Sequence, residues 1–236
     1  MSDVILTIHN LRGGYREGID ILNGIDISLH QGEVLGVIGL NGSGKSTFGR
    51  ALVNLLPHRN GEIVFNGIDI SKRSTGDLAA SGLKMMMQGG RVFTNLSVWH
   101  NLELSAKKNL PRFLEEFADE IPLLQHSAKE LQSITADKLS GGQRHQLALA
   151  MTLADNPSCI ILDEPSAGLS PASVNNIYAV LHDIHALSGV TIVLIEQNIA
   201  KAIEFSHRSV LINQGKIVRE FTTGNLQEVE SEMFNV

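Results

Sequence analysis

Several features that would point to other classes of protein are scarce in this 236-residue sequence. It has one cysteine, Cys159, so an internal disulfide is excluded and we expect a reducing compartment. Its formal net charge is −6, whereas a dedicated nucleic-acid-binding surface is normally basic. Its longest apolar runs, such as 159–162 and 190–195, are far shorter than the roughly 20 residues that span a bilayer. No secretory signal is visible, so we expect a soluble protein that reaches a membrane only by docking to an embedded partner.

Residues 39–47 form the most informative stretch, and they read Gly-Leu-Asn-Gly-Ser-Gly-Lys-Ser-Thr. They lie between an apolar run at 34–38 and a helix-compatible run at 45–56. Glycines let the backbone curl, and the following helix aims its free N–H groups at an anion. Lys45 would reach the outer phosphates of a nucleoside triphosphate, and Ser46 would place its hydroxyl on Mg²⁺. A plain glycine-rich turn is the alternative, but it does not explain why Lys and Ser follow the last glycine.

Hydrophobic residues make up 43% of the chain, which is enough for a substantial core, and the pattern of these residues predicts the strands. Alternation at 4–8 and 25–29 indicates half-buried antiparallel strands. The continuous apolar runs at 159–162 and 190–195 are typical of strands that are buried on both faces. The Asn-Gly pair at 66–67 indicates a hairpin turn.

Glycine disappears after residue 97 and returns only at Gly141, while helix-favouring residues dominate between. This texture predicts a helical insertion at about 97–138, within a helical subdomain that we place at about 97–155. The fold class is therefore α/β, with a P-loop NTPase core on a mainly parallel sheet, an N-terminal antiparallel β subdomain and a helical insertion. We expect one domain that covers residues 1–236, and a short polar helix in the tail from Thr223.

Two acids follow the predicted strand at 159–162. Ligands of parallel sheets bind at the carboxyl ends of the strands, so Asp163 would lie beside the phosphate-binding loop and hold Mg²⁺. Glu164 would be close enough to polarise the attacking water. The alternative is a pair of capping acids, which would leave the metal and nucleophile roles unfilled.

Residues 139–143 read Leu-Ser-Gly-Gly-Gln and open the helix after the insertion. Ser140 can cap this helix, and the next two glycines keep side chains away from its N-terminus, so that an anion can touch it. One nucleotide needs only one cradle of this kind. We therefore expect this second surface to bind a nucleotide that another subunit holds.

With these motifs in order, the sequence resembles the ATP-binding-cassette (ABC) ATPases over nearly its whole length. Residues 39–47 match the Walker A motif, 139–143 the signature motif, 159–164 the Walker B motif with its glutamate, and 166–171 the D-loop. Gln88 falls where the family has its Q-loop glutamine, and Tyr15 where an aromatic stacks on adenine.

The resemblance implies a set of site residues. Contacts with ATP would come from Tyr15, Gly39, Leu40, Asn41, Gly42, Ser43, Gly44, Lys45, Ser46, Thr47, Gln88, Ser140, Gly141, Gly142 and Gln143. Ligands or sensors of Mg²⁺ would be Ser46, Gln88 and Asp163, and the catalytic residues would be Glu164 and Gln197.

The resemblance also implies partners. Two ABC ATPase subunits, identical or different, would sandwich two ATP molecules head to tail, and loss of the γ-phosphate would loosen the dimer. The segment 89–98 would face a membrane permease, so we expect a cytoplasmic protein on the inner face of the plasma membrane. A substrate-binding protein would act indirectly, and we expect no nucleic-acid partner.

Three positions depart from the family pattern or stand beside a motif. Gln197 replaces the usual histidine, and it can donate a hydrogen bond but cannot carry a proton. Met151 stands where an arginine is common. We expect His145, beside the signature motif, to be exposed or at the subunit interface.

The stretch Glu196-Gln197-Asn198 and the segment 91–98 resemble ATPases of branched-chain amino acid importers, of the LivF type. Importers of urea and short amides share these traits. Other readings are a nucleotide-gated regulatory or scaffolding module with little hydrolysis, which Gln197 favours, and a soluble cassette that acts on DNA or ribosomes, which the negative charge disfavours.

Overall fold

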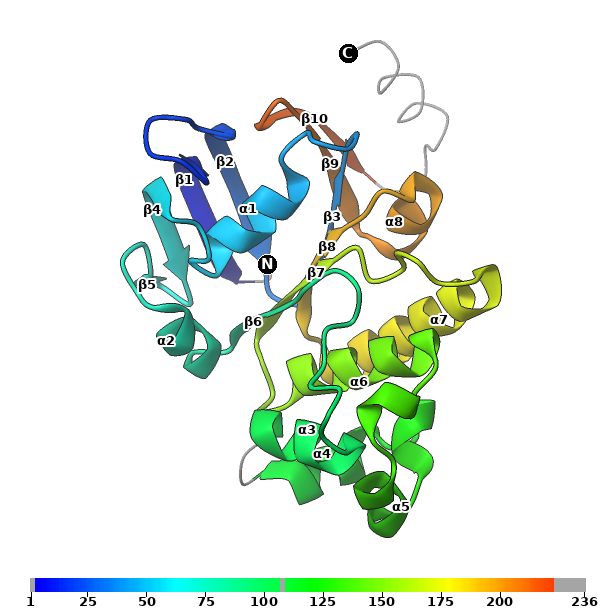
Figure 1. Ribbon diagram of the computed structural model, residues 1–236. Coiled ribbons are helices and arrows are strands. Elements are labelled where there is room, and N and C mark those ends of the chain that lie inside the picture. Colours follow the sequence, from blue (N-terminus) through cyan, green and yellow to red (C-terminus); the bar gives the residue numbers. More distant parts are fainter. Residues whose placement is uncertain (1–2, 107–108, 223–236) are drawn as a thin grey trace.

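The computed structural model describes residues 3–106 and 109–222, which form two β-sheets and a group of helices (Figure 1). One sheet is antiparallel, with the order β2–β1–β4–β5. Its strands are β1 (Val4–Gly14), β2 (Leu22–His30), β4 (His58–Phe65) and β5 (Ile68–Asp69). The prediction of antiparallel strands at 4–8 and 25–29 is confirmed. Asn66 and Gly67 form the expected turn, with φ values of 50° and 72°.

The second sheet has the order β10–β9–β3–β8–β7–β6, and it is parallel except for β10 at its edge. Its strands are β3 (Val34–Ile38), β6 (Leu83–Met86), β7 (Cys159–Asp163), β8 (Thr191–Ile195), β9 (Arg208–Asn213) and β10 (Lys216–Thr222). Every residue of β3, β7 and β8 is buried, as their continuous apolar runs predict.

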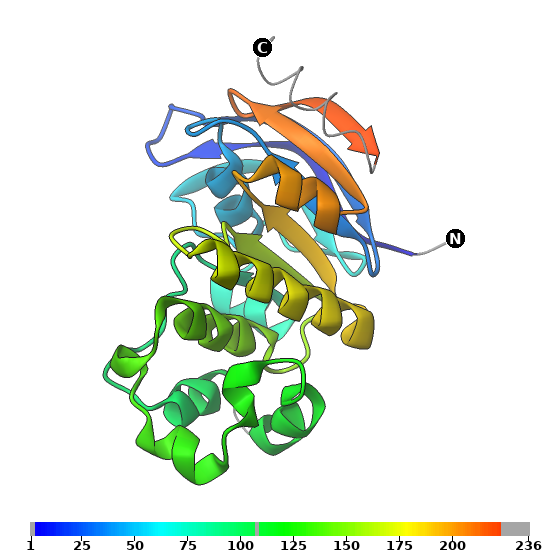
Figure 2. The ribbon, with the colours of Figure 1, turned by 90° about the vertical axis from the view of Figure 1, so that its right-hand side faces the viewer.

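Successive residues of these strands face two different cores. In β3, Leu35 and Val37 pack in the core that also contains Phe48 and the inner face of the antiparallel sheet. Val34 and Ile38 pack in the other core, which contains the helices on the opposite face. The parallel sheet is thus covered on both faces, which explains why its strands carry no polar alternation. Figure 2 shows the antiparallel strands and the green helices at opposite ends of the molecule.

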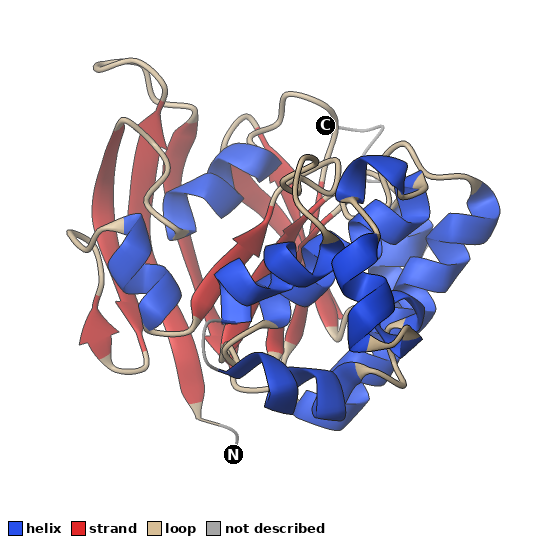
Figure 3. Ribbon diagram, turned by 60° about the horizontal axis from the view of Figure 1, so that its bottom comes forward, coloured by secondary structure: helices blue, strands red, loops and turns tan. Residues whose placement is uncertain are grey.

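The helices are α1 (Lys45–Leu52), α2 (Thr75–Ala80), α3 (Val98–Ala106), α4 (Leu110–Phe117), α5 (Ala128–Ser133), α6 (Gly141–Leu153), α7 (Pro171–Ser188) and α8 (Ile199–Phe205), with short 3₁₀ turns at Pro122–Gln125 and Ala136–Lys138. Those from α3 to α6 fall in the range 97–155. Figure 3 shows most of the helices on one side of the molecule. Division of the chain into one domain with a helical subdomain stays a prediction. None of the helices in the described ranges is both long and apolar enough to cross a membrane.

Two local features differ from expectation. Helix α1 ends at Leu52 rather than near residue 56, because Asn54 adopts a left-handed conformation (φ 56°) that stops the helix. Helix α2 was not anticipated; Ser74 and Asp77 form a capping box at its start, and it buries only Leu78. The helix expected from Thr223 lies outside the described residues.

Candidate functional site

The site lies where four neighbouring parallel strands end. Strand β3 leads into residues 39–47, here called the P-loop, and β7 leads into Glu164. Strand β8 leads into Gln197, and β6 ends two residues before Gln88. Because β3, β8, β7 and β6 are adjacent in the sheet, residues that lie far apart in sequence meet at one edge.

The P-loop is wrapped tightly around the side chain of Lys45. The Lys45 Nζ donates to the carbonyls of Gly39 at 2.8 Å and Leu40 at 3.0 Å, and the residue is only 4% exposed. Gly39 has a φ of 153°, and a Cβ there would lie 2.3 Å from the Ile212 carbonyl. Burial lowers the pKa of Lys45, while the charges of nearby carboxylates, chiefly Glu164, oppose the shift. The Lys45 ammonium group is therefore fixed inside the P-loop by backbone carbonyls, where it can contact a bound phosphate.

Ser46 and Asp163 form a pair that fits Mg²⁺. The Ser46 hydroxyl donates to Asp163 Oδ1 at 2.8 Å, whereas Oδ2 is buried and has no hydrogen-bond partner among the described residues. Burial raises the pKa of Asp163, against the effects of Ser46 and nearby cations. A hard cation beside the unpartnered oxygen would remove its desolvation cost. No cluster of three or more His, Cys, Asp or Glu suits a metal in the described ranges. Ser46 and Asp163 supply oxygen ligands of the kind that Mg²⁺ prefers.

Glu164 and Gln88 are in direct contact. The Gln88 Nε2 donates to Glu164 Oε2 at 2.5 Å. Glu164 has a φ of 49°, and its N–H donates to the Ile195 carbonyl at 2.9 Å. Burial raises the pKa of Glu164, Lys45 opposes this, and Asp163 adds to it. The carboxylate thus has some of the basicity that activation of water requires. The structure places Gln88 against Glu164, and its expected role toward Mg²⁺ stays a prediction.

The expected adenine and γ-phosphate contacts lie at the exposed side of the site. Tyr15 is 42% exposed, and its hydroxyl accepts a hydrogen bond from Arg50 Nη1 at 2.8 Å. The Arg50 guanidinium also lies over the Tyr15 ring, with its Cζ 5.8 Å from the ring centroid, and stacking of this ring on adenine stays a prediction. Gln197 is exposed next to the buried end of β8. Three residues of the P-loop tip are also exposed: Leu40, Asn41 and Gly42.

The Leu-Ser-Gly-Gly-Gln motif starts α6 with a complete capping box. Ser140 Oγ accepts from the Gln143 N–H at 3.2 Å, and Gln143 Oε1 accepts from the Ser140 N–H at 3.0 Å. Ser140 and Gly141 are exposed. Figures 1 and 2 place α6 well apart from the loop that precedes α1, so the two phosphate cradles do not meet within one chain.

His145 is buried, and the expectation of an exposed or interfacial side chain is wrong. It is 5% exposed, and its Nδ1 lies 2.9 Å from the Gly141 carbonyl. It packs against Gly90, where an added Cβ would lie 3.0 Å from Nδ1. His145 therefore belongs to the contact between the start of α6 and the segment after Gln88.

Comparison with known proteins agrees with this geometry. Residues 22–167 match the family described as ABC transporter. The chain is 32% identical to the phosphonates import ATP-binding protein PhnC 2 of Nostoc sp., over 96% of this chain and 97% of that one. The chain belongs to the ATP-binding-cassette (ABC) transporter family. It is an ATPase, and its fold is that of the family's P-loop NTPase domain.

Other relatives of this ABC ATPase carry out different transport tasks. The lipopolysaccharide export protein LptB of Haemophilus influenzae is 30% identical over 97% of this chain and 93% of its own length. A probable branched-chain amino acid transport protein LivF of Archaeoglobus fulgidus is 31% identical over 93% of each chain. The ADP-bound ABC cassette MJ1267 superposes with a TM-score of 0.80, at 26% identity, over 99% of this chain and 96% of that one.

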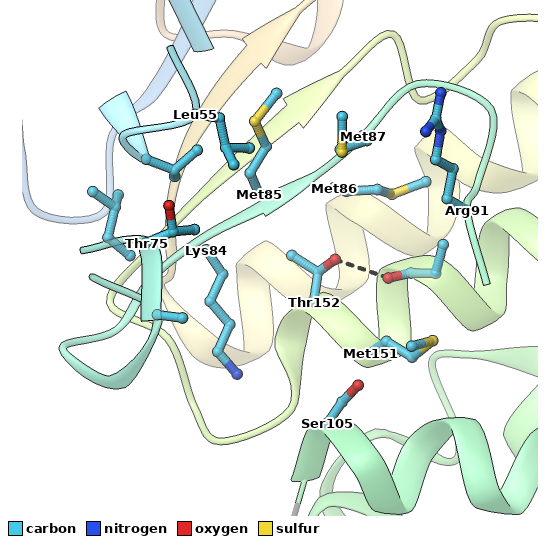
Figure 4. A pocket seen from close by; sticks show the side chains of 14 residues that line it. Leu55, Thr75, Lys84, Met85, Met86, Met87, Arg91, Ser105, Met151 and Thr152 are labelled. Carbon is cyan, nitrogen blue, oxygen red and sulfur yellow. Dashed lines mark hydrogen bonds between the residues drawn. The ribbon is translucent and has the colours of Figure 1, made fainter. Parts of the chain in front are cut away.

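The ABC ATPase has an apolar cavity of about 360 Å³ beside the segment that follows Gln88 (Figure 4). Its walls come from β6, α2, α3 and α6, and they include four methionines, namely Met85, Met86, Met87 and Met151. An unbranched thioether can adapt its shape to such a wall, which also includes Lys84 and Arg91. Met151, which stands where the family commonly has an arginine, is thus part of the wall of this cavity.

Two residues of the site were missed at the level of sequence. Glu196 is 2% exposed, and its charge acts on Lys45, Asp163 and Glu164. Gly215 lies in the β9–β10 turn, and its N–H donates to the Ser43 carbonyl of the P-loop at 2.8 Å. An acid directly after a buried strand was a usable sign of Glu196, whereas nothing local marks Gly215 as part of the site.

Proposed function

We propose that this ABC ATPase powers an importer for branched-chain or related amino acids. The observation that carries the ATPase mechanism is the meeting of Lys45, Ser46, Asp163 and Glu164 at one sheet edge. Support for the cargo class is narrower: the LivF relative and the Glu196-Gln197-Asn198 stretch. Phosphonate import and lipopolysaccharide export among the relatives mean that family membership alone leaves cargo and direction open. Urea or a short amide is the alternative cargo.

In the proposed mechanism, the P-loop N–H groups and Lys45 bind the β- and γ-phosphates of ATP, and Tyr15 stacks on adenine. Ser46 and Asp163 would hold Mg²⁺, and Gln88 would sense it. Bound Mg²⁺ would neutralise charge on the phosphate oxygens. Glu164 orients and deprotonates the attacking water, and Gln197 donates a hydrogen bond to the γ-phosphate. The Gln88 amide already donates a hydrogen bond to Glu164 Oε2. During turnover this amide therefore either moves away from Oε2 or keeps its hydrogen bond while the carboxylate also binds the attacking water.

A second ABC ATPase subunit completes each site. Ser140, Gly141, Gly142 and Gln143 are too far from their own P-loop to reach the same ATP, so they would contact the ATP that the partner holds. The exposed, capped start of α6 suits this role, because its free N–H groups can face a γ-phosphate. The partner is a second copy or a different cassette.

Membrane permease subunits would dock beside the segment 89–98, next to the methionine-lined cavity. Such docking would put the protein in the cytoplasm, on the inner face of the plasma membrane, and a substrate-binding protein would act through the permease. Docking is tested with Met87→Lys, which puts a charge in the cavity wall. It should abolish co-purification with the permease, whereas Leu187→Lys on exposed α7 should not. Equal retention of both variants would contradict this docking site.

The experiment that tests the function is the mass of Glu164→Gln in solution with Mg-ATP and with Mg-ADP. An ATP-dependent dimer, alone or with a second cassette from the same gene neighbourhood, is expected. A monomer under all conditions would contradict the shared site. Reconstitution with permease and binding protein should then give ATPase stimulation by leucine, isoleucine or valine. Stimulation by urea or a short amide instead would select the alternative cargo.

A further inference from the structure

Glu196 is a buried carboxylate with no place in the mechanism above. It follows the last residue of β8 and is 2% exposed. Its own N–H donates to the Val37 carbonyl of β3 at 3.1 Å, which fixes its backbone beside the strand that feeds the P-loop. Burial of an ionised carboxylate is strongly unfavourable unless hydrogen bonds compensate it. The groups around its two oxygens therefore decide whether this residue is tolerated.

The two oxygens of Glu196 bind two different segments. Oε1 accepts from the Ser166 hydroxyl at 2.7 Å and from the Ser166 N–H at 3.3 Å. Oε2 accepts from the N–H groups of Gln197 at 3.1 Å and Asn198 at 3.3 Å. One carboxylate thus joins the loop after β7 to the loop after β8. An amide could not do this, because it offers only one acceptor oxygen.

Ser166 is two residues beyond Glu164, in the same turn. The Ala167 N–H closes this turn by donating to the Glu164 carbonyl at 3.1 Å. Glu164 sits at a φ of 49°, a conformation that is strained for a non-glycine residue and persists only where surrounding contacts hold it. The bond from Ser166 to Glu196 is one such contact.

We propose that Glu196 is a positioning residue for ATP hydrolysis, which fastens the turn that carries Glu164 to the segment that carries Gln197. This inference rests on the proposed roles of Glu164 and Gln197. Glu196 acts through these two residues rather than on ATP itself. Its loss should therefore slow the chemical step and leave nucleotide binding nearly intact.

The test is Glu196→Gln in the full-length protein, since this change keeps the shape and removes one acceptor. The expected result is a fall in kcat of about 10- to 100-fold, the size typical of slight misplacement in an active site. KM and the Kd for ATP should stay within about threefold, as expected when ground-state binding is untouched. A folded variant with the kcat of the wild type overturns the proposal, and so does a variant that loses ATP affinity but keeps kcat.

Glu33→Gln is the matched control. Glu33 is partly buried, and like Glu196 it is a carboxylate that accepts hydrogen bonds, here from Arg208 and from the His30 N–H. It directly precedes β3, at the opposite end of the strand from the site. It should keep kcat even if it lowers the melting temperature. An equal loss of kcat in both variants would overturn the proposal, because it would show a general effect of destabilisation.

Ser166 provides a second route that holds even if Glu196→Gln fails to fold. Ser166→Ala removes the 2.7 Å hydrogen bond, whereas Ser166→Thr keeps a hydroxyl. We expect a lowered kcat in the first and substantial rescue in the second, and equal rates in both would overturn the proposal. Glu164→Gln is measured in parallel. If it keeps full activity, the proposed role of Glu164 fails; if it is inactive while the Ser166 and Glu196 variants are normal, only the present inference fails.

Discussion

Gln88 Nε2 and Glu164 Oε2 lie 2.5 Å apart, so the amide at the end of one strand is hydrogen-bonded to the acid at the end of the next. Strands β6 and β7 pair directly, from Leu83 with Cys159 to Met86 with Leu162, which brings the two side chains together. The segment beyond Gln88 borders the methionine-lined cavity. A movement of that segment would thus shift Gln88 and change its hydrogen bond to the Glu164 carboxylate.

The first prediction concerns this pair. Glu164→Gln should lower kcat by about 10²- to 10⁴-fold, the usual contribution of a general base, and leave the Kd for ATP within about threefold. Gln88→Ala alone should lower kcat less. If Gln88 acts through Glu164, the variant that carries both Gln88→Ala and Glu164→Gln should be no slower than Glu164→Gln alone. The rate of phosphate release in single-turnover experiments measures this. Multiplying effects would contradict this coupling.

The second prediction concerns Mg²⁺. Asp163→Asn replaces the carboxylate whose Oδ2 is buried without a partner among the described residues. ATP affinity of the natural protein should rise when Mg²⁺ is added, and this increase should be lost or strongly reduced in Asp163→Asn. Titration of a fluorescent ATP analogue with Mg²⁺ or with chelator measures it. Affinity in chelator is the control, and it should be equal or better in the variant, because a negative charge near the phosphates is gone.

The third prediction compares the effects of alanine substitution at two glycines that have the same φ but different surroundings. Gly215 and Gly67 both have a φ of 72°, but a Cβ at Gly215 would lie 1.7 Å from the Ile21 carbonyl, whereas one at Gly67 meets nothing within 4 Å. Gly67→Ala should cost about 1 kcal/mol of unfolding free energy, through φ alone. Gly215→Ala should cost clearly more and should also weaken ATP binding, because Gly215 braces Ser43 of the P-loop. Denaturant unfolding and ATP titration measure both, and equal effects would contradict the bracing role.

Patterns that are local in the sequence predicted much of this molecule. Each buried strand of the parallel sheet is a short apolar run, and the P-loop, the acids at 163–164 and the capped start of α6 are contiguous motifs. The P-loop and the two acids meet at one edge because the strands that lead into them are parallel, whereas the start of α6 lies apart from them. Helix α2 escaped prediction because it has six residues and buries a single side chain, so it has no periodicity to detect.

Contacts between distant segments could not be predicted in this way. Ser166 and Glu196 are 30 residues apart, and no local pattern indicates that one carboxylate oxygen will accept both donors of that serine. His145 follows a glycine-rich surface motif, yet its position on α6 turns it inward toward Gly90. These details depend on how α6, β7 and β8 pack, which is a property of the assembled fold.

The fourth prediction uses Cys159, the chain's single cysteine, which is fully buried in β7. Burial raises the pKa of its thiol from 9.0 to about 12. Since the thiolate is the reactive form, native protein should not react with a disulfide reagent at about pH 8, and one thiol per chain should react in denaturant. Above about pH 9 the unfolded thiol loses its proton and the folded one keeps it, so unfolding is favoured as pH rises, by at most about 1.4 kcal/mol per pH unit. Cys159→Ala should lack this component when its pH–stability curve is compared with that of the natural protein, and parallel curves up to about pH 11 would contradict the assignment.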